Sequence, residues 1–275
     1  MSETKSSRVL VNIIGVPSLL SIIVLGDNTY NFPIFSIFVL IVLLLGSIEV
    51  PILVERMKGK PFLPLLMIFI FILQTNRLPY FDSFMSNYDL LVLITLLSMI
   101  IEVFRKQKTS MVNIFSVLFA FVWLGLMLGS LSVLRNIDSI GFTLTLFMFL
   151  GVWICDTSAF LFGKKFGKKK ILPKVSPNKT WVGTVMGLII TMIFMVSMYC
   201  FDYFPLIISF WDVMCISLII GICGQLGDFS ESLLKREAQI KDSSNLLRGH
   251  GGILDRFDSL AFVSPIILMY YKYFI

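Results

Sequence analysis

Residues that could do chemistry are concentrated in one stretch of the chain, Gly224 to Leu260, which is flanked on both sides by apolar runs. Its charged residues recur at helical spacing: Asp228, Glu231 and Lys235 before a glycine-rich turn, and Asp255 and Asp258 after it. Side chains three and four residues apart share one face of a helix. The spacing therefore predicts two groups of carboxylates that face each other across a helix, a loop and a second helix.

These carboxylates suit Mg²⁺, which binds one or two protein carboxylates and completes its coordination with water and substrate phosphate. The alternative interpretation is a set of interfacial salt bridges without a metal, formed among Asp228, Glu231, Lys235, Arg236, Asp255 and Arg256. We favour the metal site, because acids contribute little to membrane topology and this many exceed what a solvated loop requires.

Asp156 lies inside an apolar run that ends near Lys164. An aspartate that faces lipid near the middle of a membrane costs on the order of 3 kcal/mol. We therefore expect Asp156 to face a wet cavity, and a metal or substrate site is the expected reason for its presence.

His250 is the only histidine of the chain and is surrounded by Gly249, Gly251 and Gly252. These glycines leave backbone N–H groups free to approach an anion. We predict a nucleotide or phosphate contact here. The alternative is a flexible hinge with an incidental imidazole.

A second polar loop, Gly163 to Thr180, is strongly basic, and most of its charge is explained as a topology signal. Its end is more specific, because the residues from Ser176 to Trp181 join a turn to the start of a helix. Hydroxyl groups, Lys179 and N-terminal amides can converge on a phosphate at such a place.

The elements that position these residues are membrane helices. Of the 275 residues, 57% are hydrophobic and 15% are charged, and the mean hydropathy is +0.89. We predict an all-α, polytopic membrane protein with about nine transmembrane helices. The expected spans are Val9–Leu25, Pro33–Val54, Phe62–Gln74, Leu90–Phe104, Met111–Leu134, Gly141–Phe162, Trp181–Cys200, Pro205–Leu226 and Ser259–Ile275. The first is interpreted as a span rather than a signal peptide, because no small-residue cleavage site follows it.

Loop charge predicts the orientation of these spans. Basic and acidic loops alternate along the chain, which places the N-terminus and the polar loops 163–180 and 227–258 in the cytoplasm and the C-terminus outside. The net charge of +6 follows from this bias, so a nucleic-acid partner is not expected. We expect two regions: N-terminal transmembrane helices over residues 1–140, and a catalytic transmembrane region over residues 141–275.

The run from Ser232 to Asp258, SLLKREAQIKDSSNLLRGHGGILDRFD, resembles the signature of the phosphatidate cytidylyltransferase family, also called CDP-diacylglycerol synthases. The matching residues are Ser232, Lys235, Arg236, Lys241, Asp242, His250, Gly251, Gly252, Asp255, Arg256 and Asp258. The resemblance extends over roughly residues 150 to 260 and includes Asp156 and the turn at Ser176. Three positions depart from the family pattern: Val182 replaces a frequent glutamate, Ser158 a glycine and Arg248 a proline.

The resemblance implies that CTP and phosphatidate react to give CDP-diacylglycerol and pyrophosphate. The lipid phosphate is then the nucleophile, so catalysis requires positioning and charge neutralisation rather than a covalent enzyme intermediate. The expected cofactor is Mg²⁺ on Asp228, Asp255 and Asp258, with Glu231 and Asp156 as further candidate ligands and a second cation left open. The expected catalytic set is Asp228, Asp255, Asp258, Lys235 and His250, and the expected substrate-binding set is Lys179, Ser176, Arg236, Lys241, Asp242, Gly251, Gly252 and Arg256.

Two other classes of protein would also use intramembrane acids or a polar loop. An ion-coupled secondary transporter could place Asp156 on its ion pathway, although the repeat symmetry or paired broken helices typical of transporters is not visible. A structural membrane protein could use its polar loop to recruit partners. The expected location is a bacterial-type cell membrane with multiple passes, and a homodimer is implied only by the resemblance.

Overall fold

The computed structural model describes residues 15–26, 32–78, 84–244, 246 and 251–275. In these residues the chain is helical without a β-strand, and the only isolated bridge joins Lys170 to Thr180. The helices are Gly15–Leu25, α2 (Ile34–Val54), η1 (Glu55–Met57), α3 (Leu63–Thr75), α4 (Asn87–Arg105), α5 (Ser110–Ala120), the π-helix η2 (Phe121–Leu128), α6 (Ser130–Arg135), α7 (Gly141–Phe166), α8 (Trp181–Cys200), α9 (Phe210–Glu237) and α10 (Leu254–Phe274). The expected all-α class is confirmed.

Six helical segments within the described residues are long and apolar enough to cross a membrane: 34–57, 87–105, 110–135, 141–166, 181–200 and 210–237. The protein is therefore a multi-spanning membrane protein. The helices Gly15–Leu25 and α3 are apolar but shorter, and α10, which carries charged residues in its first two turns, is not among the six. The predicted count of nine crossings stays a prediction.

Helix α9 continues eleven residues beyond the expected end of its span at Leu226 and ends at Glu237. Side-chain contacts four residues apart support this extension: Lys235 pairs with Glu231, and the Ser232 hydroxyl donates to Asp228. Basic residues in the last turn also complement the helix dipole. The predicted site residues Asp228, Glu231 and Lys235 therefore lie on a helix. The connection from α9 to α10 covers only residues 238–253.

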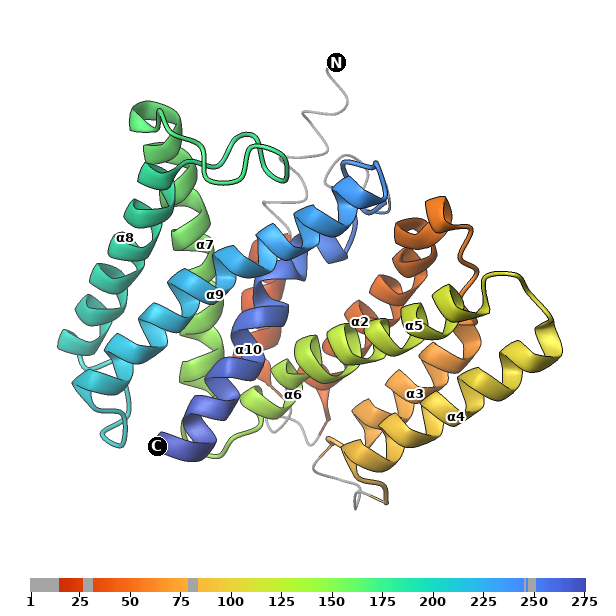
Figure 1. Cartoon of the computed structure of the whole chain (residues 1–275). Coiled ribbons are helices and arrows are strands. Elements are labelled where there is room, and N and C mark those ends of the chain that lie inside the picture. The colour runs from red at the N-terminus through yellow and green to blue at the C-terminus, as the bar shows by residue number, and fades with distance from the viewer. Residues whose placement is uncertain (1–14, 27–31, 79–83, 245, 247–250) are drawn as a thin grey trace.

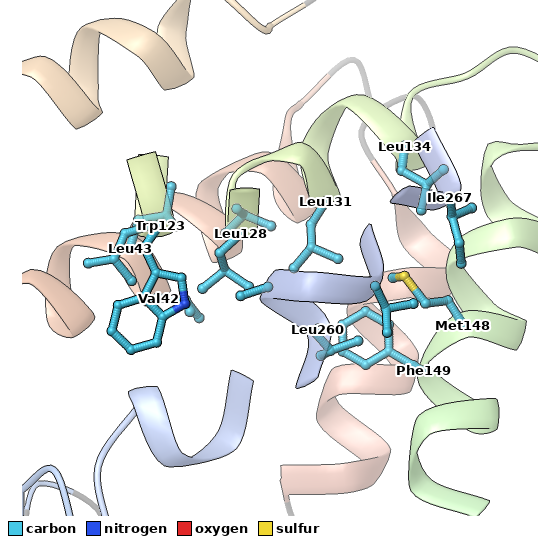
Figure 2. Packing of buried hydrophobic residues seen from close by; sticks show 14 of the residues in the cluster. Val42, Leu43, Trp123, Leu128, Leu131, Leu134, Met148, Phe149, Leu260 and Ile267 are labelled. Atoms are coloured by element: carbon cyan, nitrogen blue, oxygen red, sulfur yellow. The ribbon is translucent and has the colours of Figure 1, made fainter. Parts of the chain in front are cut away.

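Helix α10 lies at the centre of the hydrophobic core, between the N-terminal helices and α7. Figure 2 shows buried residues of α10, Leu260 and Ile267, together with Leu131 and Leu134 of α6 and Met148 and Phe149 of α7. Inside a membrane such packing stabilises helix association through van der Waals contact, since lipid is as apolar as the side chains. The start of α10 is thus fixed relative to both halves of the chain.

Glycines allow the four C-terminal helices to approach closely. A Cβ at Gly187 of α8 would lie 3.0 Å from the Cys155 carbonyl of α7, and one at Gly227 of α9 would lie 2.6 Å from the Asp258 carbonyl of α10. Small residues at such positions let helix backbones pack together. The contact at Gly227 holds Asp258 directly against α9.

The connections α7–α8 and α9–α10 lie at the same end of the molecule, at the top of Figure 1. The Arg236 side chain links them, because its Nε donates to the Val175 carbonyl at 3.1 Å. The opposite end of Figure 1 holds the α8–α9 connection and the end of α10. The two polar loops predicted to act together are therefore adjacent.

Candidate active site

A cavity of about 780 Å³ opens between α7, α8, α9 and α10. Its charged lining residues are Asp156, Lys164, Lys170, Lys179, Asp228, Asp255, Arg256 and Asp258. A volume of this size is within the range of small-molecule sites, and the balance of acids and bases suits a ligand that brings both phosphate and metal. The expectation that Asp156 faces a cavity agrees with its place in the lining.

Asp156 of α7, Asp228 of α9 and Asp258 of α10, which we call the cavity acids, meet in this cavity. Each of the three is close enough to another to be repelled by its charge. One counter-ion is Lys179, whose Nζ lies 2.5 Å from Asp228 Oδ2. Carboxylates gathered in this way are stabilised by a cation, and the lysine supplies part of that stabilisation.

Lys179 is positioned by the fold-back of the α7–α8 connection. The Ile171 N–H donates to the Lys179 carbonyl at 3.3 Å, and the Trp181 N–H donates to the Lys169 carbonyl at 3.1 Å. Thr180 then begins α8 by accepting a hydrogen bond from the Gly183 N–H at 3.2 Å, as N-cap residues commonly do. The lysine ammonium also lies 4.4 Å from the centre of the Phe229 ring. Ring and carboxylate together fix the ammonium beside α9.

A second group of charges adjoins the cavity, and Asp255 is its member in the cavity lining. Lys235 Nζ lies 3.0 Å from Glu231 Oε2 and 2.5 Å from Asp255 Oδ1. These three side chains are at most 11% exposed, so their ion pairs form largely out of contact with water. Two ion pairs of the salt-bridge alternative are therefore present, although Asp228 pairs with Lys179.

Both oxygens of Asp255 are occupied by hydrogen bonds. Oδ1 accepts from Lys235, while Oδ2 accepts from the Ser243 N–H at 3.0 Å, the Ser243 hydroxyl at 3.0 Å and the Gly252 N–H at 2.7 Å. Gly251 has a φ of +78°, and a Cβ there would lie 2.5 Å from the same oxygen. The geometry thus gives Asp255 a role in closing the loop. The Gly252 amide, which was expected to contact a phosphate, donates to Asp255 instead.

The donor set fits Mg²⁺ if water and phosphate supply part of the coordination shell. No three His, Cys, Asp or Glu side chains among the described residues are close enough to hold a metal by themselves. Mg²⁺, however, needs only one or two protein carboxylates. The Glu231 carboxylate is buried close to Asp258, and two negative charges there would repel each other. A cation near Asp258 would relieve this repulsion.

Six predicted substrate-binding residues lie outside the cavity lining: Ser176, Arg236, Lys241, Asp242, Gly251 and Gly252. Arg236 bonds the α7–α8 connection instead, and Lys241 and Asp242 are exposed at the surface. Arg256 is exposed and does line the cavity. His250 and Arg248 lie outside the described residues.

The structure adds residues that the sequence did not indicate. Gln225 lines the cavity and donates from Nε2 to the Thr184 carbonyl at 3.1 Å, which joins α9 to α8. Ser243 and Ser244 bond a buried acid of α2, Glu49. An acid inside an apolar span is the signal that could have found Glu49, since the same cost argument singled out Asp156.

A model described as "Cytidylyltransferase family" matches residues 6–274. A phosphatidate cytidylyltransferase of Bacillus subtilis (strain 168) is 29% identical over 265 residues, which cover 94% of this chain and 95% of that protein. Proteins of the same name from Staphylococcus saprophyticus and Staphylococcus haemolyticus are 45% identical over 148 residues and 48% identical over 122 residues, covering 54% and 44% of this chain and 54% and 46% of theirs.

Proposed function

The chain belongs to the cytidylyltransferase family, and we propose that it transfers the cytidylyl group of CTP to phosphatidate, with CDP-diacylglycerol and pyrophosphate as products. One observation carries this proposal: a cavity lined by both acids and lysines opens among helices apolar enough to lie in a membrane. The named relative from Bacillus subtilis, which aligns over nearly the whole chain, supports the choice of substrates. A lipid phosphate and a charged nucleotide can meet only at such a place.

In the proposed reaction a phosphate oxygen of phosphatidate attacks the α-phosphorus of CTP. The new bond joins that oxygen to phosphorus, and the bond from the α-phosphorus to the bridging oxygen of the β-phosphate breaks, which releases pyrophosphate. Two anions must approach each other, so the main barrier is electrostatic and positional. Lys164, Lys170, Lys179 and Arg256 supply positive charge around the cavity for these phosphates.

We assign Mg²⁺ to Asp228 and Asp258, with Asp156 and Glu231 as further ligands or neighbours. When bound, the ion would neutralise phosphate charge and strengthen the electrophilic character of the α-phosphorus. Asp255 would have to give up a bond from Lys235 or from the loop to join this set, so its first role is to hold the loop. The number of acids would also allow a second cation to bind.

The remaining assignments rest on the sequence and the resemblance. His250, Gly251, Gly252, Lys235, Arg236, Lys241, Asp242 and Ser176 are proposed to complete the nucleotide site when CTP is bound. Nine crossings with a cytoplasmic N-terminus and an external C-terminus place the site where CTP is dissolved. We propose the bacterial cell membrane as the location. Residues 1–140 form the proposed scaffold and residues 141–275 the proposed catalytic region. A homodimer is the proposed assembly.

The test is pyrophosphate release by the purified full chain in detergent, supplied with CTP. Release that requires both phosphatidate and Mg²⁺ is the expected result. Uptake of a labelled ion into vesicles without CTP turnover would replace the proposal with a secondary transporter. Absence of both activities in folded protein would leave a structural role.

A further inference from the structure

Glu49 is an acid buried in the N-terminal half, far in sequence from every residue assigned to the site. It lies in α2, and 1% of its surface is exposed. The span around it has a mean hydropathy of 2.8. A carboxylate in such a place costs free energy unless its oxygens are hydrogen-bonded.

Within the described residues, the Glu49 carboxylate accepts four hydrogen bonds from the segment that closes the candidate site. Oε1 accepts from the Ser244 hydroxyl at 2.6 Å and from the Ile253 N–H at 2.8 Å. Oε2 accepts from the Ser243 hydroxyl at 2.8 Å and from the Leu254 N–H at 3.0 Å. One side chain therefore ties Ser243 and Ser244 to the start of α10.

Two of these donors are amides at the start of α10. The first amides of a helix have no partner within the helix, and here the N-cap residue Ile253 provides no side-chain cap. Glu49 supplies that cap from another helix, with its negative charge at the positive end of the helix dipole. The start of α10, from which Asp255 and Asp258 project, is thereby fixed to α2.

Ser243 links this carboxylate to the catalytic segment. Its hydroxyl lies 2.8 Å from Glu49 Oε2 and 3.0 Å from Asp255 Oδ2, yet it has a single proton to donate. Its N–H donates to Asp255 as well. Gly252 fits between these groups only because it lacks a Cβ, which would overlap the Ser243 hydroxyl and both Glu49 oxygens. Gly252, one of the glycines predicted to bind substrate, is thus required by Ser243 and Glu49.

We infer that Glu49 is a positioning residue for cytidylyl transfer, which holds the α9–α10 connection and the first turn of α10 in the geometry that the cavity acids require. This inference rests on the proposed function. Glu49 is absent from the cavity lining, so it acts through Ser243, Gly252 and Asp255. Groups that orient the direct ligands of a metal typically change affinity or activity by about 10- to 100-fold when they are replaced.

The test compares Glu49→Gln with Glu102→Gln in the purified full chain. Glu102 is a matched control: it is also a buried acid of the N-terminal half, 5% exposed, and it bonds Asn113 and Arg105 away from the cavity. The amide of Glu49→Gln keeps one acceptor oxygen but turns N–H donors toward hydroxyl and backbone donors. We expect kcat/KM for CTP to fall about 10- to 100-fold, with an increase in the Mg²⁺ concentration for half-maximal rate.

Hydrogen–deuterium exchange gives a readout that does not depend on activity. Peptides covering the start of α10 should exchange about 10-fold faster in Glu49→Gln, while Glu102→Gln should match the unmodified chain in both exchange and Mg²⁺ dependence. If the unmodified chain has no CTP turnover, the proposed function fails, whereas the exchange result still tests the contact of Glu49 with α10.

Ser244→Ala provides a second route if Glu49→Gln does not fold in detergent. It removes one donor to Glu49 and leaves the carboxylate in place, so the same changes are expected at about 3- to 10-fold. Unchanged kcat/KM and exchange in the folded variant, or equal losses in Glu102→Gln, would overturn the inference.

Discussion

The acids in and around the candidate site belong to two environments. The cavity acids Asp156, Asp228 and Asp258 share an open cavity with repelling charges. Asp255 also lines the cavity and Glu49 does not, and every one of their carboxylate oxygens accepts hydrogen bonds from Lys235, the α9–α10 connection or the start of α10. Together with Glu231, Lys235 and Ser243 we call them the buried network.

This difference indicates which carboxylates are available to bind a cation. A carboxylate that accepts hydrogen bonds from backbone N–H groups and hydroxyls of the connection fixes the position of those donors, and removing its charge leaves them buried and unsatisfied. A carboxylate held near other acids gains from binding a cation. Replacing residues of the buried network should therefore change both stability and turnover, whereas replacing cavity acids should change turnover alone.

The largest effect is expected for Asp255→Asn. Product formation from CTP should be abolished, about 10³-fold or more, because the loop and Lys235 lose their common anion. The protein should remain folded in detergent with a free energy of unfolding lower by roughly 1.5–3 kcal/mol, the range for hydrogen bonds to charged groups. Turnover measurements test the loss of product formation, and thermal unfolding tests the loss of stability. Near-normal turnover would show that Asp255 does not belong to the site.

A smaller effect is expected for Lys179→Met. The methionine keeps contact with Phe229 but removes the ion pair to Asp228, so the cavity acids lose a counter-ion. The KM for CTP should rise about 10- to 100-fold, because the lysine is one of the positive charges proposed to hold phosphate. Lys179→Arg is the matched control and should retain most of the affinity. Steady-state kinetics with unchanged KM for Lys179→Met would exclude a phosphate contact.

The smallest effect is expected for Val182→Glu, which introduces the glutamate that is frequent at this position in the family that the sequence resembles. Val182 is in the first turn of α8, is 37% exposed and does not line the cavity. Turnover should therefore change by less than about threefold, while a negative charge near the helix N-terminus should stabilise the protein by about 0.3–1 kcal/mol. A large gain in turnover would show that position 182 belongs to the site.

Local spacing predicted much of the site. The helical repeat of Asp228 and Glu231 with Lys235, and the cost of an acid in a span at Asp156, indicated which side chains would gather. The turn that leads into a helix start identified Lys179. The sequence could not show that Ser176 and Arg236 would lie away from the cavity, since the fold-back of the connection is a tertiary feature.

The sequence did not identify Glu49, and the reason differs from that for Ser176 and Arg236. The sequence shows an acid within an apolar run, which is the same signal that identified Asp156, but its partner Ser243 lies 194 residues away. The choice of partner depends on how α2 packs near the start of α10, and helical spacing carries no information about that contact. Both the extension of α9 to Glu237 and this contact became visible only in the folded chain.

The central claim is that the cavity acids hold the cation that the phosphates of CTP require. It is tested most directly by the Mg²⁺ dependence of pyrophosphate release in Asp228→Asn beside the unmodified chain, at saturating CTP and phosphatidate. We predict saturable activation by Mg²⁺ in the unmodified chain, and a rate at least about 10²-fold lower in a variant with normal thermal unfolding. Full turnover with the same Mg²⁺ dependence in Asp228→Asn would contradict the account.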